Sequence, residues 1–314
     1  MLILNNILYQ HILYMDLYFY FEMNKKIVSV DFVDFWPNFY KEDNYFYHLL
    51  KTKFDVKITN NNPDLLFYSN DYMHENNRFK KQYEKSRKIF FSGESSSPDF
   101  DFADLSLTCH KSTDKNFRLP LWVLFINWFD VRYKKDRDQS FLLDQQKLLK
   151  VNKRVNKKLC SFVASNNSGK RMEVIPKLLK EIDIDCGGQL FNNTNKTIKG
   201  RGDQKWKIKF LQKYKFNFCF ENDLVDGYVT EKIIHSMFAN SIPIYWGSDV
   251  VFDDFNKNSF IYLNEYNLDE LTIKLNQLNK NENEYLELLS QPWFKNNQFP
   301  SSMLPGKVLE QIIG

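Results

Sequence analysis

Short apolar runs separated by polar or mixed segments dominate the pattern of the chain. Each run has the length of a buried β-strand and ends near polar residues or glycine. The runs lie at residues 27–33, 54–58, 64–69, 88–92, 159–165, 216–220, 242–246 and 259–263. Amphipathic helices are expected at residues 268–280 and 283–290. Strands that alternate with helical segments predict an α/β protein with parallel sheets.

The segment 214–248 has the most regular pattern, and the rest of the prediction is organised around it. Residues 216–220 form an apolar strand, and residues 221–227 form a polar loop. Gly227 in this loop is a candidate for a positive φ angle. A second buried strand follows at residues 242–246. The order strand, loop, helix, strand predicts a βαβ unit, and ligands bind at the carboxyl ends of such strands.

The helix of this unit is expected to begin after Thr230, which can act as its N-cap. Glu231 and Lys232 then lie in the first helical turn. The positive end of the helix dipole favours a carboxylate there and disfavours an ammonium. Lys232 is therefore better explained if an anion such as a diphosphate lies in front of it.

The composition agrees with a folded protein of two domains. The chain has 314 residues, of which 43% are hydrophobic and 17% aromatic, so it can bury two cores. The net charge of +4 suits a small anionic ligand and does not require nucleic acid. The four cysteines have no paired spacing that would indicate a zinc site or a disulfide framework.

Residues 1–22 are apolar and aromatic, but Asn, Gln, His, Asp and Glu interrupt them. A membrane-spanning helix needs about 20 mostly apolar residues, so spanning is not expected. A basic n-region and a cleavage site, which a signal peptide would have, are not visible. Either the functional chain starts near Met23, or the segment forms a weak interfacial helix. We expect a cytoplasmic or peripheral membrane protein, or a Golgi membrane protein if this segment acts as an anchor.

Three motifs in chain order carry a resemblance to a known family. FNFCFEN, GYVTEKI and IPIYWGS resemble the donor-site signature of the α-1,3-fucosyltransferases, and the likeness covers roughly residues 205–265. It implies a GT-B fold, in which two Rossmann-like parallel-sheet domains face a central cleft. It also implies an inverting enzyme that uses GDP-fucose as donor. The expected acceptor is a glycan that contains N-acetylglucosamine (GlcNAc) or glucose, fucosylated at O3 of that unit.

The resemblance and the patterns together suggest how the chain divides. The expected parts are an N-terminal extension (1–22), an acceptor-binding domain (23–130), a basic linker or helix (131–157), a GDP-fucose-binding domain (158–300) and a C-terminal tail (301–314). Residues 133–158 carry nine Lys or Arg against three Asp, which raises nucleic-acid binding as an alternative. Since no aromatic stacking platform accompanies these charges, we expect a solvated basic face and no nucleic-acid partner.

Glu94 is the candidate catalytic residue. It follows the strand predicted at residues 88–92 and so lies at the edge of the sheet where ligands bind. A single glutamate in a loop is more often simply solvated. The segment FFSGESSSPDF, however, is similar to the family's segment in which a Gly-Glu pair supplies the general base. The resemblance thus assigns Glu94 as the base.

The donor-binding residues are carried over from the same motifs. FVASN is followed in the family by an arginine that contacts the diphosphate, and Arg171 is the preferred match. Lys170 is the alternative because the turn is one residue shorter here. Lys232 is expected to neutralise the diphosphate as well, and Glu231, by its position in the family's motif, to accept hydrogen bonds from the ribose hydroxyls.

The same motifs assign Asn222 and Tyr228 to the nucleoside part of the donor. Two Asp-x-Asp patterns, at residues 99–101 and 136–138, match a metal-binding motif of another glycosyltransferase fold by chance. We therefore expect no obligatory metal or other cofactor, because Lys and Arg can neutralise the leaving diphosphate.

Overall fold

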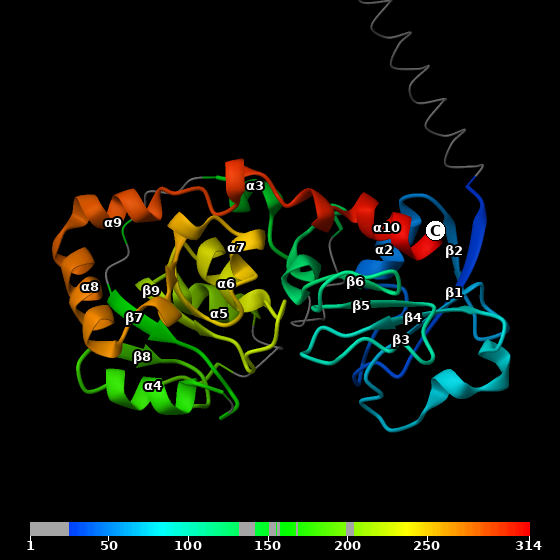
Figure 1. The fold of residues 1–314 in the computed structure, drawn as a ribbon, viewed down its shortest axis with the longest axis horizontal. Coiled ribbons are helices and arrows are strands. Elements are labelled where there is room, and N and C mark those ends of the chain that lie inside the picture. The colour runs from blue at the N-terminus through cyan, green and yellow to red at the C-terminus, as the bar shows by residue number, and fades with distance from the viewer. Residues whose placement is uncertain (1–24, 132–141, 151–154, 156–157, 168, 199–203) are drawn as a thin grey trace, which may run out of the picture. The chain divides into compact units, whose positions relative to one another are not determined.

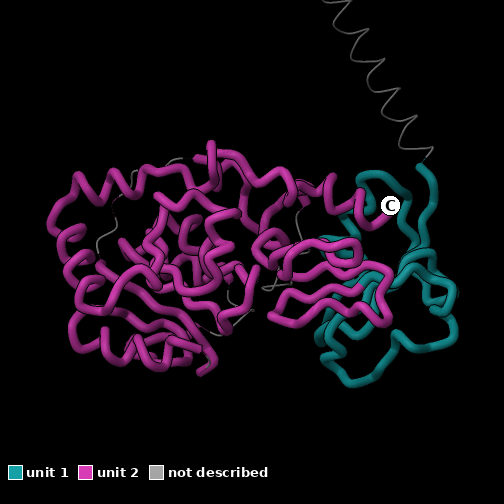
Figure 2. Tube along the Cα trace, viewed as in Figure 1, with its two compact units in different colours: residues 1–89 teal, residues 90–314 magenta. Residues whose placement is uncertain are grey.

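The fold contains two parallel β-sheets. A computed structural model describes residues 25–131, 142–150, 155, 158–167, 169–198 and 204–314 (Figure 1). The chain divides into two compact units, Met1–Ile89 and Phe90–Gly314 (Figure 2). Within the described residues, no helix is long and apolar enough to cross a membrane. The predictions for residues 1–22 fall outside the described residues.

The first sheet has the strand order β2-β1-β3-β4-β5-β6, and the division between the two compact units falls inside β4. Its strands are β1 (Ile27–Val33), β2 (Asp55–Ile58), β3 (Leu65–Tyr68), β4 (Arg87–Phe91), β5 (Leu105–Thr108) and β6 (Asn116–Arg118). In the first unit β1 pairs in parallel with both β2 and β3, and helix α2 (Tyr45–Lys51) connects β1 to β2. In the second unit β5 pairs in parallel with β6.

The second sheet lies within the second unit and has the order β11-β10-β9-β7-β8. Its strands are β7 (Lys158–Phe162), β8 (Ile184–Cys186), β9 (Tyr214–Phe220), β10 (Ile242–Trp246) and β11 (Ile261–Tyr262). The helices of this unit are α3 (Gln145–Leu148), α4 (Arg171–Leu178), α5 (Gln204–Leu211), α6 (Glu231–Phe238), α7 (Val251–Asp254), α8 (Leu268–Lys280), α9 (Glu282–Leu289) and α10 (Pro305–Ile313). Strand β9 is central and pairs in parallel with β7 and β10.

Alternate residues of β9 face different helices, as the two-residue repeat of a strand requires. Phe216, Phe218 and Phe220 belong to a hydrophobic core that α4, α8 and α9 cover. Asn217 and Cys219 point to the other face, where α6 packs and the side chain of Asn217 donates a hydrogen bond to Ser236 at 2.7 Å. The described helices thus cover both faces of the sheet, and ligands bind such sheets at the carboxyl ends of the strands.

Most of the strands and helices predicted from the sequence are confirmed. β1, β10 and α8 have the predicted bounds. The strand predicted at residues 259–263 is reduced to the two residues of β11. β5, β6, β8 and α5 were not predicted. The domain boundaries near residues 130 and 158 stay a prediction, because much of the segment between them lies outside the described residues.

A buried ion pair holds the loop that follows β9. Arg118, at the end of β6, donates from its two Nη atoms to the two oxygens of Asp254, each at 2.8 Å. The Nη2 atom of Arg118 also donates to the carbonyl oxygen of Gly227 at 3.3 Å. Gly227 has the predicted positive φ of 80°, and a Cβ there would lie 2.0 Å from the carbonyl oxygen of Cys109. Only glycine fits this position. The backbone conformation of Gly227 in turn fixes the direction in which the chain continues to Tyr228.

We predict that Asp254→Asn lowers the free energy of unfolding by roughly 3–5 kcal/mol, because it leaves the buried Arg118 guanidinium without a carboxylate. Denaturant unfolding measures this change. Asp253→Asn is the matched control, since Asp253 is an exposed neighbour on the same helix. Equal stabilities of the two variants would contradict the prediction.

Candidate functional site

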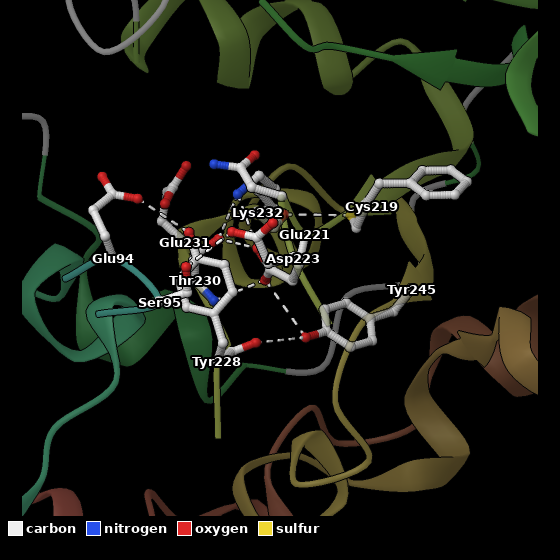
Figure 3. Close-up of polar contacts among 12 residues, drawn as sticks. Glu94, Ser95, Cys219, Glu221, Asp223, Tyr228, Thr230, Glu231, Lys232 and Tyr245 are labelled. Atoms are coloured by element: carbon white, nitrogen blue, oxygen red, sulfur yellow. Dashed lines mark hydrogen bonds and ion pairs between the residues drawn. The ribbon is translucent and has the colours of Figure 1, made fainter. Parts of the chain in front are cut away.

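A cavity of about 250 Å³ lies in the second unit, beside the segments that follow β7 and β9. All six residues proposed from the sequence line it: Glu94, Arg171, Asn222, Tyr228, Glu231 and Lys232. Figure 3 shows Glu94, Tyr228, Glu231 and Lys232 together with the polar contacts around Glu221. The structure thus brings every candidate site residue to one place.

Glu221 is the buried residue around which the site is built. It follows β9 directly, and its side chain is fully buried. Its Oε1 atom accepts a hydrogen bond from the backbone N–H of Thr230 at 2.8 Å, and its Oε2 atom accepts one from the Thr230 hydroxyl at 2.7 Å. The Lys232 ammonium donates to Oε2 at 2.9 Å. A buried charge needs such partners, because burial removes its hydration.

These contacts correct the role that the sequence suggested for Thr230. Helix α6 begins at Glu231 with Thr230 as the N-cap residue, but the Thr230 side chain accepts no backbone hydrogen bond. Its hydroxyl donates to Glu221 instead and accepts from Lys232 at 2.8 Å. The Thr230 hydroxyl therefore binds these two charged side chains and not a backbone N–H, since hydrogen bonds to charged groups are stronger than those between neutral groups.

Lys232 also has an anionic partner inside the protein, which its position in the first turn of the helix does not indicate. Burial lowers the pKa of Lys232, but the charges of Glu221 and Glu231 more than offset this effect, so its pKa lies above its usual value. The ammonium therefore stays charged next to the cavity. Its position alone does not require an external anion.

Arg171 is buried at the start of α4 and has a different set of partners. Its Nη2 atom donates to the carbonyl oxygens of Phe220 and Glu221 at 3.2 and 2.9 Å and to Oδ1 of Asn222 at 2.8 Å. Its Nη1 atom donates to Oδ1 of Asn166 at 2.6 Å. Within the described chain these bonded partners are neutral oxygens, and burial lowers the pKa of Arg171. A buried cation with neutral partners is favourably placed for an anion in the adjoining cavity.

The alternative to Arg171 does not reach the cavity. Lys170 pairs with Glu173 on the exposed side of α4 and is not among the cavity-lining residues. The turn before them comes close to the loop after β9, since a Cβ on Gly169 would lie 2.6 Å from the carbonyl oxygen of Asn222. Asn222, proposed as a nucleoside contact, is thereby held against Arg171 in the described structure.

Glu94 contacts the loop after β9 within the second unit. It lies three residues after the end of β4, and the hydroxyl of Tyr228 donates to its Oε2 atom at 3.2 Å (Figure 3). Burial, Glu221 and Glu94 raise the pKa of Tyr228, so its hydroxyl stays protonated and can donate. Next to this contact, Ser95 donates to Asp223 at 2.9 Å. The candidate base is therefore oriented by a residue that the sequence assigned to the donor.

Glu231 lies in the first turn of α6 and is held ionised. Burial raises the pKa of its carboxyl, but the charges of Lys232 and Lys207 more than offset this, and its pKa falls to about 2. The Nζ atom of Lys207 lies 3.9 Å from its Oε1 atom. Lys207 and Gln204 also line the cavity, although the sequence motifs indicate neither of them as a site residue.

The spacing of the buried side chains in α5 is the signal that could have indicated Gln204 and Lys207. The buried residues of this helix are Gln204, Lys207, Ile208 and Leu211, which follow the i, i+3, i+4, i+7 repeat of a buried helix face. Lys205 and Lys209 are exposed. In the sequence, Lys205, Lys207 and Lys209 occur at every second position, so the different burial of Lys207 is not apparent.

The acidic motif at residues 99–101 and the cysteines show no metal-site geometry in the described residues. No group of three or more His, Cys, Asp or Glu side chains that could hold a metal occurs in the part of the chain that the structure describes. Asp99 accepts backbone hydrogen bonds from Asp101 and Phe102 in a local turn. Residues 136–138 lie outside the described residues. All four cysteines are buried free thiols, as expected for small core residues.

Comparison with known proteins places the chain in a family. Residues 152–303 match Glycosyltransferase family 10 (fucosyltransferase) C-term. Residues 30–125 match the Alpha-(1,3)-fucosyltransferase FucT N-terminal domain. Alpha-(1,3)-fucosyltransferase FucT of Helicobacter pylori is 31% identical over 233 residues, which are 66% of this chain and 47% of that protein. The chain thus spans about half the length of this curated relative.

Solved structures confirm the fold. A crystal structure of an α1,3-fucosyltransferase has a TM-score of 0.69 and 25% identity, with 93% of this chain and 90% of that chain covered. A crystal structure of an α1,3-fucosyltransferase with GDP-fucose has a TM-score of 0.66 and 23% identity, with 93% and 92% covered. The expected GT-B type with two parallel-sheet domains is therefore correct. Because the two family matches follow each other in chain order and extend over both sheets, the chain belongs to the family 10 fucosyltransferases.

Proposed function

We propose that this protein transfers L-fucose from GDP-fucose to O3 of a GlcNAc or glucose unit in a glycan acceptor, with inversion, to make an α-1,3 linkage. One observation carries the proposal. A carboxylate, Glu94, lines the same cavity as two cations, Arg171 and Lys232. A transferase that deprotonates a hydroxyl and releases a diphosphate needs this combination. The H. pylori relative and the crystal structure of an α1,3-fucosyltransferase with GDP-fucose support the choice of donor and linkage.

In this proposal the second sheet binds the donor at the end of β9. Lys232 and Arg171 neutralise the diphosphate, and Glu231 accepts hydrogen bonds from the ribose hydroxyls. Asn222 and Tyr228 contact the nucleoside part. The Lys232 ammonium is already held by Glu221 at 2.9 Å, and Arg171 by the carbonyl oxygens of the strand end, so neither cation has to reorganise when the ligand binds.

The transfer itself is a single displacement. The O3 atom of the acceptor attacks the anomeric carbon of fucose, and the bond from that carbon to the β-phosphate oxygen breaks. Glu94 takes the proton of the acceptor hydroxyl, and GDP leaves with the bonding electron pair. The anomeric carbon becomes oxocarbenium-like, as in glycoside chemistry generally. One displacement inverts the anomeric centre, so an enzyme nucleophile is not needed.

Two alternatives remain, and they differ from the proposal in the sugar donor or in whether a transfer reaction takes place. Another GT-B transferase would use a different nucleotide sugar or linkage, and a non-catalytic carbohydrate-binding protein would bind without transfer. Titration calorimetry with GDP, GDP-fucose, GDP-mannose and UDP-sugars separates these classes by affinity. A transfer assay with N-acetyllactosamine then tests the acceptor. Transfer from a UDP-sugar but not from GDP-fucose would refute the proposed donor.

Glu94→Gln is expected to reduce turnover by about 10²–10⁴-fold, the range that a positioned base contributes. Glutamine keeps the size of the side chain and can still accept from Tyr228, but it removes the basicity. GDP affinity should stay nearly unchanged, and the decrease in rate at acid pH should disappear. Steady-state kinetics and calorimetry measure these values. Near wild-type transfer by the variant would show that Glu94 is not the base.

Lys232→Ala is expected to weaken GDP binding by roughly 1.5–3 kcal/mol, the scale of charge-assisted hydrogen bonds. Calorimetry measures the affinity. Because the variant also leaves the buried Glu221 without its ammonium partner, the comparison includes Glu221→Gln/Lys232→Ala. This double variant should recover stability but not affinity. Lys170→Ala should bind GDP normally, since Lys170 pairs with Glu173 outside the cavity. Unchanged affinity of Lys232→Ala would refute the assignment.

Chelation of divalent metals with EDTA is expected to leave transfer largely intact. In this proposal Lys232 and Arg171 stabilise the charge of the leaving diphosphate, a role that a divalent metal has in other transferases. Transfer rates with and without EDTA check this. A complete loss that added metal reverses would be incompatible with it.

A further inference from the structure

Lys207 is a buried cation to which the proposed reaction assigns no role. It lies on α5, and its side chain is 11% exposed. Burial lowers the pKa of Lys207, which the negative charge of Glu231 opposes. Burying an ammonium costs free energy that packing alone does not return. A nearby negative charge is therefore needed to explain why the Lys207 ammonium is buried.

The partners of the neighbouring lysine indicate what Lys207 does. Lys232 donates to Glu221 at 2.9 Å and to Thr230 at 2.8 Å, so its hydrogen bonds are directed away from Glu231. Within the described chain, the ion pair of Glu231 is with Lys207, at 3.9 Å. This separation is longer than a hydrogen bond, so the carboxylate stays available to an incoming donor group.

The other groups that face Glu231 do not replace Lys207. His235 lies one turn further along α6 and is fully buried, and neither of its ring nitrogens has a hydrogen-bond partner in the described chain. Burial lowers its pKa well below the usual value, so its ring is neutral. Lys232 acts on Glu231 through its field alone, as its ammonium is bound to Glu221. Lys207 is thus the cation within ion-pair distance of Glu231.

We propose that Lys207 is a positioning residue that holds the Glu231 carboxylate directed into the cavity, where it accepts hydrogen bonds from the ribose hydroxyls of the bound nucleotide. This inference rests on the proposed function, because it takes GDP as the nucleotide. Both side chains line the cavity, which places their ion pair beside the ligand. Lys207 acts through Glu231 and does not itself contact the sugar or the diphosphate.

Gln204 supports a ligand-binding role for this face of α5. It precedes Lys207 by one helical turn, is 3% exposed, and lines the same cavity. Its Oε1 atom is buried without a hydrogen-bond partner in the described chain. An unsatisfied buried acceptor costs free energy, and an N–H or O–H group of a nucleoside would satisfy it. The face of α5 that carries Lys207 therefore presents an acceptor that a ligand in the cavity can use.

The test compares two nucleotides that differ only in the ribose. The affinity of the full chain for GDP and for 2′,3′-dideoxy-GDP is measured by calorimetry for the wild type and for Lys207→Met. The variant should bind GDP about tenfold more weakly, whereas its affinity for dideoxy-GDP should change by less than about twofold. Lys205→Met is the matched control, because it removes the same charge from an exposed site on the same helix. It should bind both nucleotides normally.

Two further variants distinguish positioning from a general effect on the fold. Lys207→Arg should recover most of the GDP affinity, since it restores a cation. In a Glu231→Gln background, Lys207→Met should change GDP affinity by less than about twofold, because the group through which it acts is then neutral. Thermal melting checks that each variant is folded. Lys207→Gln repeats the measurements with a polar side chain if methionine lowers the melting temperature.

The outcomes separate this inference from the proposed function. Equal losses for GDP and dideoxy-GDP would overturn the inference, because they would place the action of Lys207 on the diphosphate or on the whole site. Additive losses in the Glu231→Gln background would overturn it as well. If wild type binds GDP and Lys207→Met binds it equally well, the inference is wrong and the proposed function stands. If wild type binds neither nucleotide, the proposed function itself is wrong.

Discussion

The buried carboxylate of Glu221 is the interaction on which the candidate site depends. It lies where β9 ends, and it accepts hydrogen bonds from the backbone and hydroxyl of Thr230 and from the Lys232 ammonium. A charge with no exposed surface is stable only if these partners are in place. The chain that leaves β9 must therefore return to it within nine residues, and α6 begins where it returns.

This requirement positions the candidate catalytic and binding groups together. The loop that returns to Glu221 carries Tyr228, whose hydroxyl donates to Glu94. It is also held at Gly227 by Arg118, which is paired with Asp254. The candidate base and the cations therefore derive their orientation from one loop with bonded partners on several sides. Such groups reorganise little when charge develops in a reaction, which is the condition for strong electrostatic catalysis.

Much of the fold could be predicted because continuous runs and regular repeats of hydrophobic residues indicate buried strands and helices. β10 and α8 have their predicted bounds, since each is a continuous apolar run or a clear amphipathic repeat. The short strands β6 and β8 were not predicted, because three residues carry too little pattern. Thr230 is the N-cap residue of α6 as predicted, but its hydroxyl binds a carboxylate nine residues earlier in the chain and caps no backbone N–H.

By itself, the sequence determined the βαβ unit and the set of polar residues that gather where β9 ends, because strand and helix periods follow from backbone geometry. Only the tertiary structure decided how these residues pair. The sequence explains Lys232 only by an external anion, whereas the fold places the Glu221 carboxylate 2.9 Å from its ammonium. Lys207 differs from Lys205 and Lys209 only in being buried against its neighbours. Ion pairs and burial depend on distances between segments that the fold brings together, and no local pattern contains those distances.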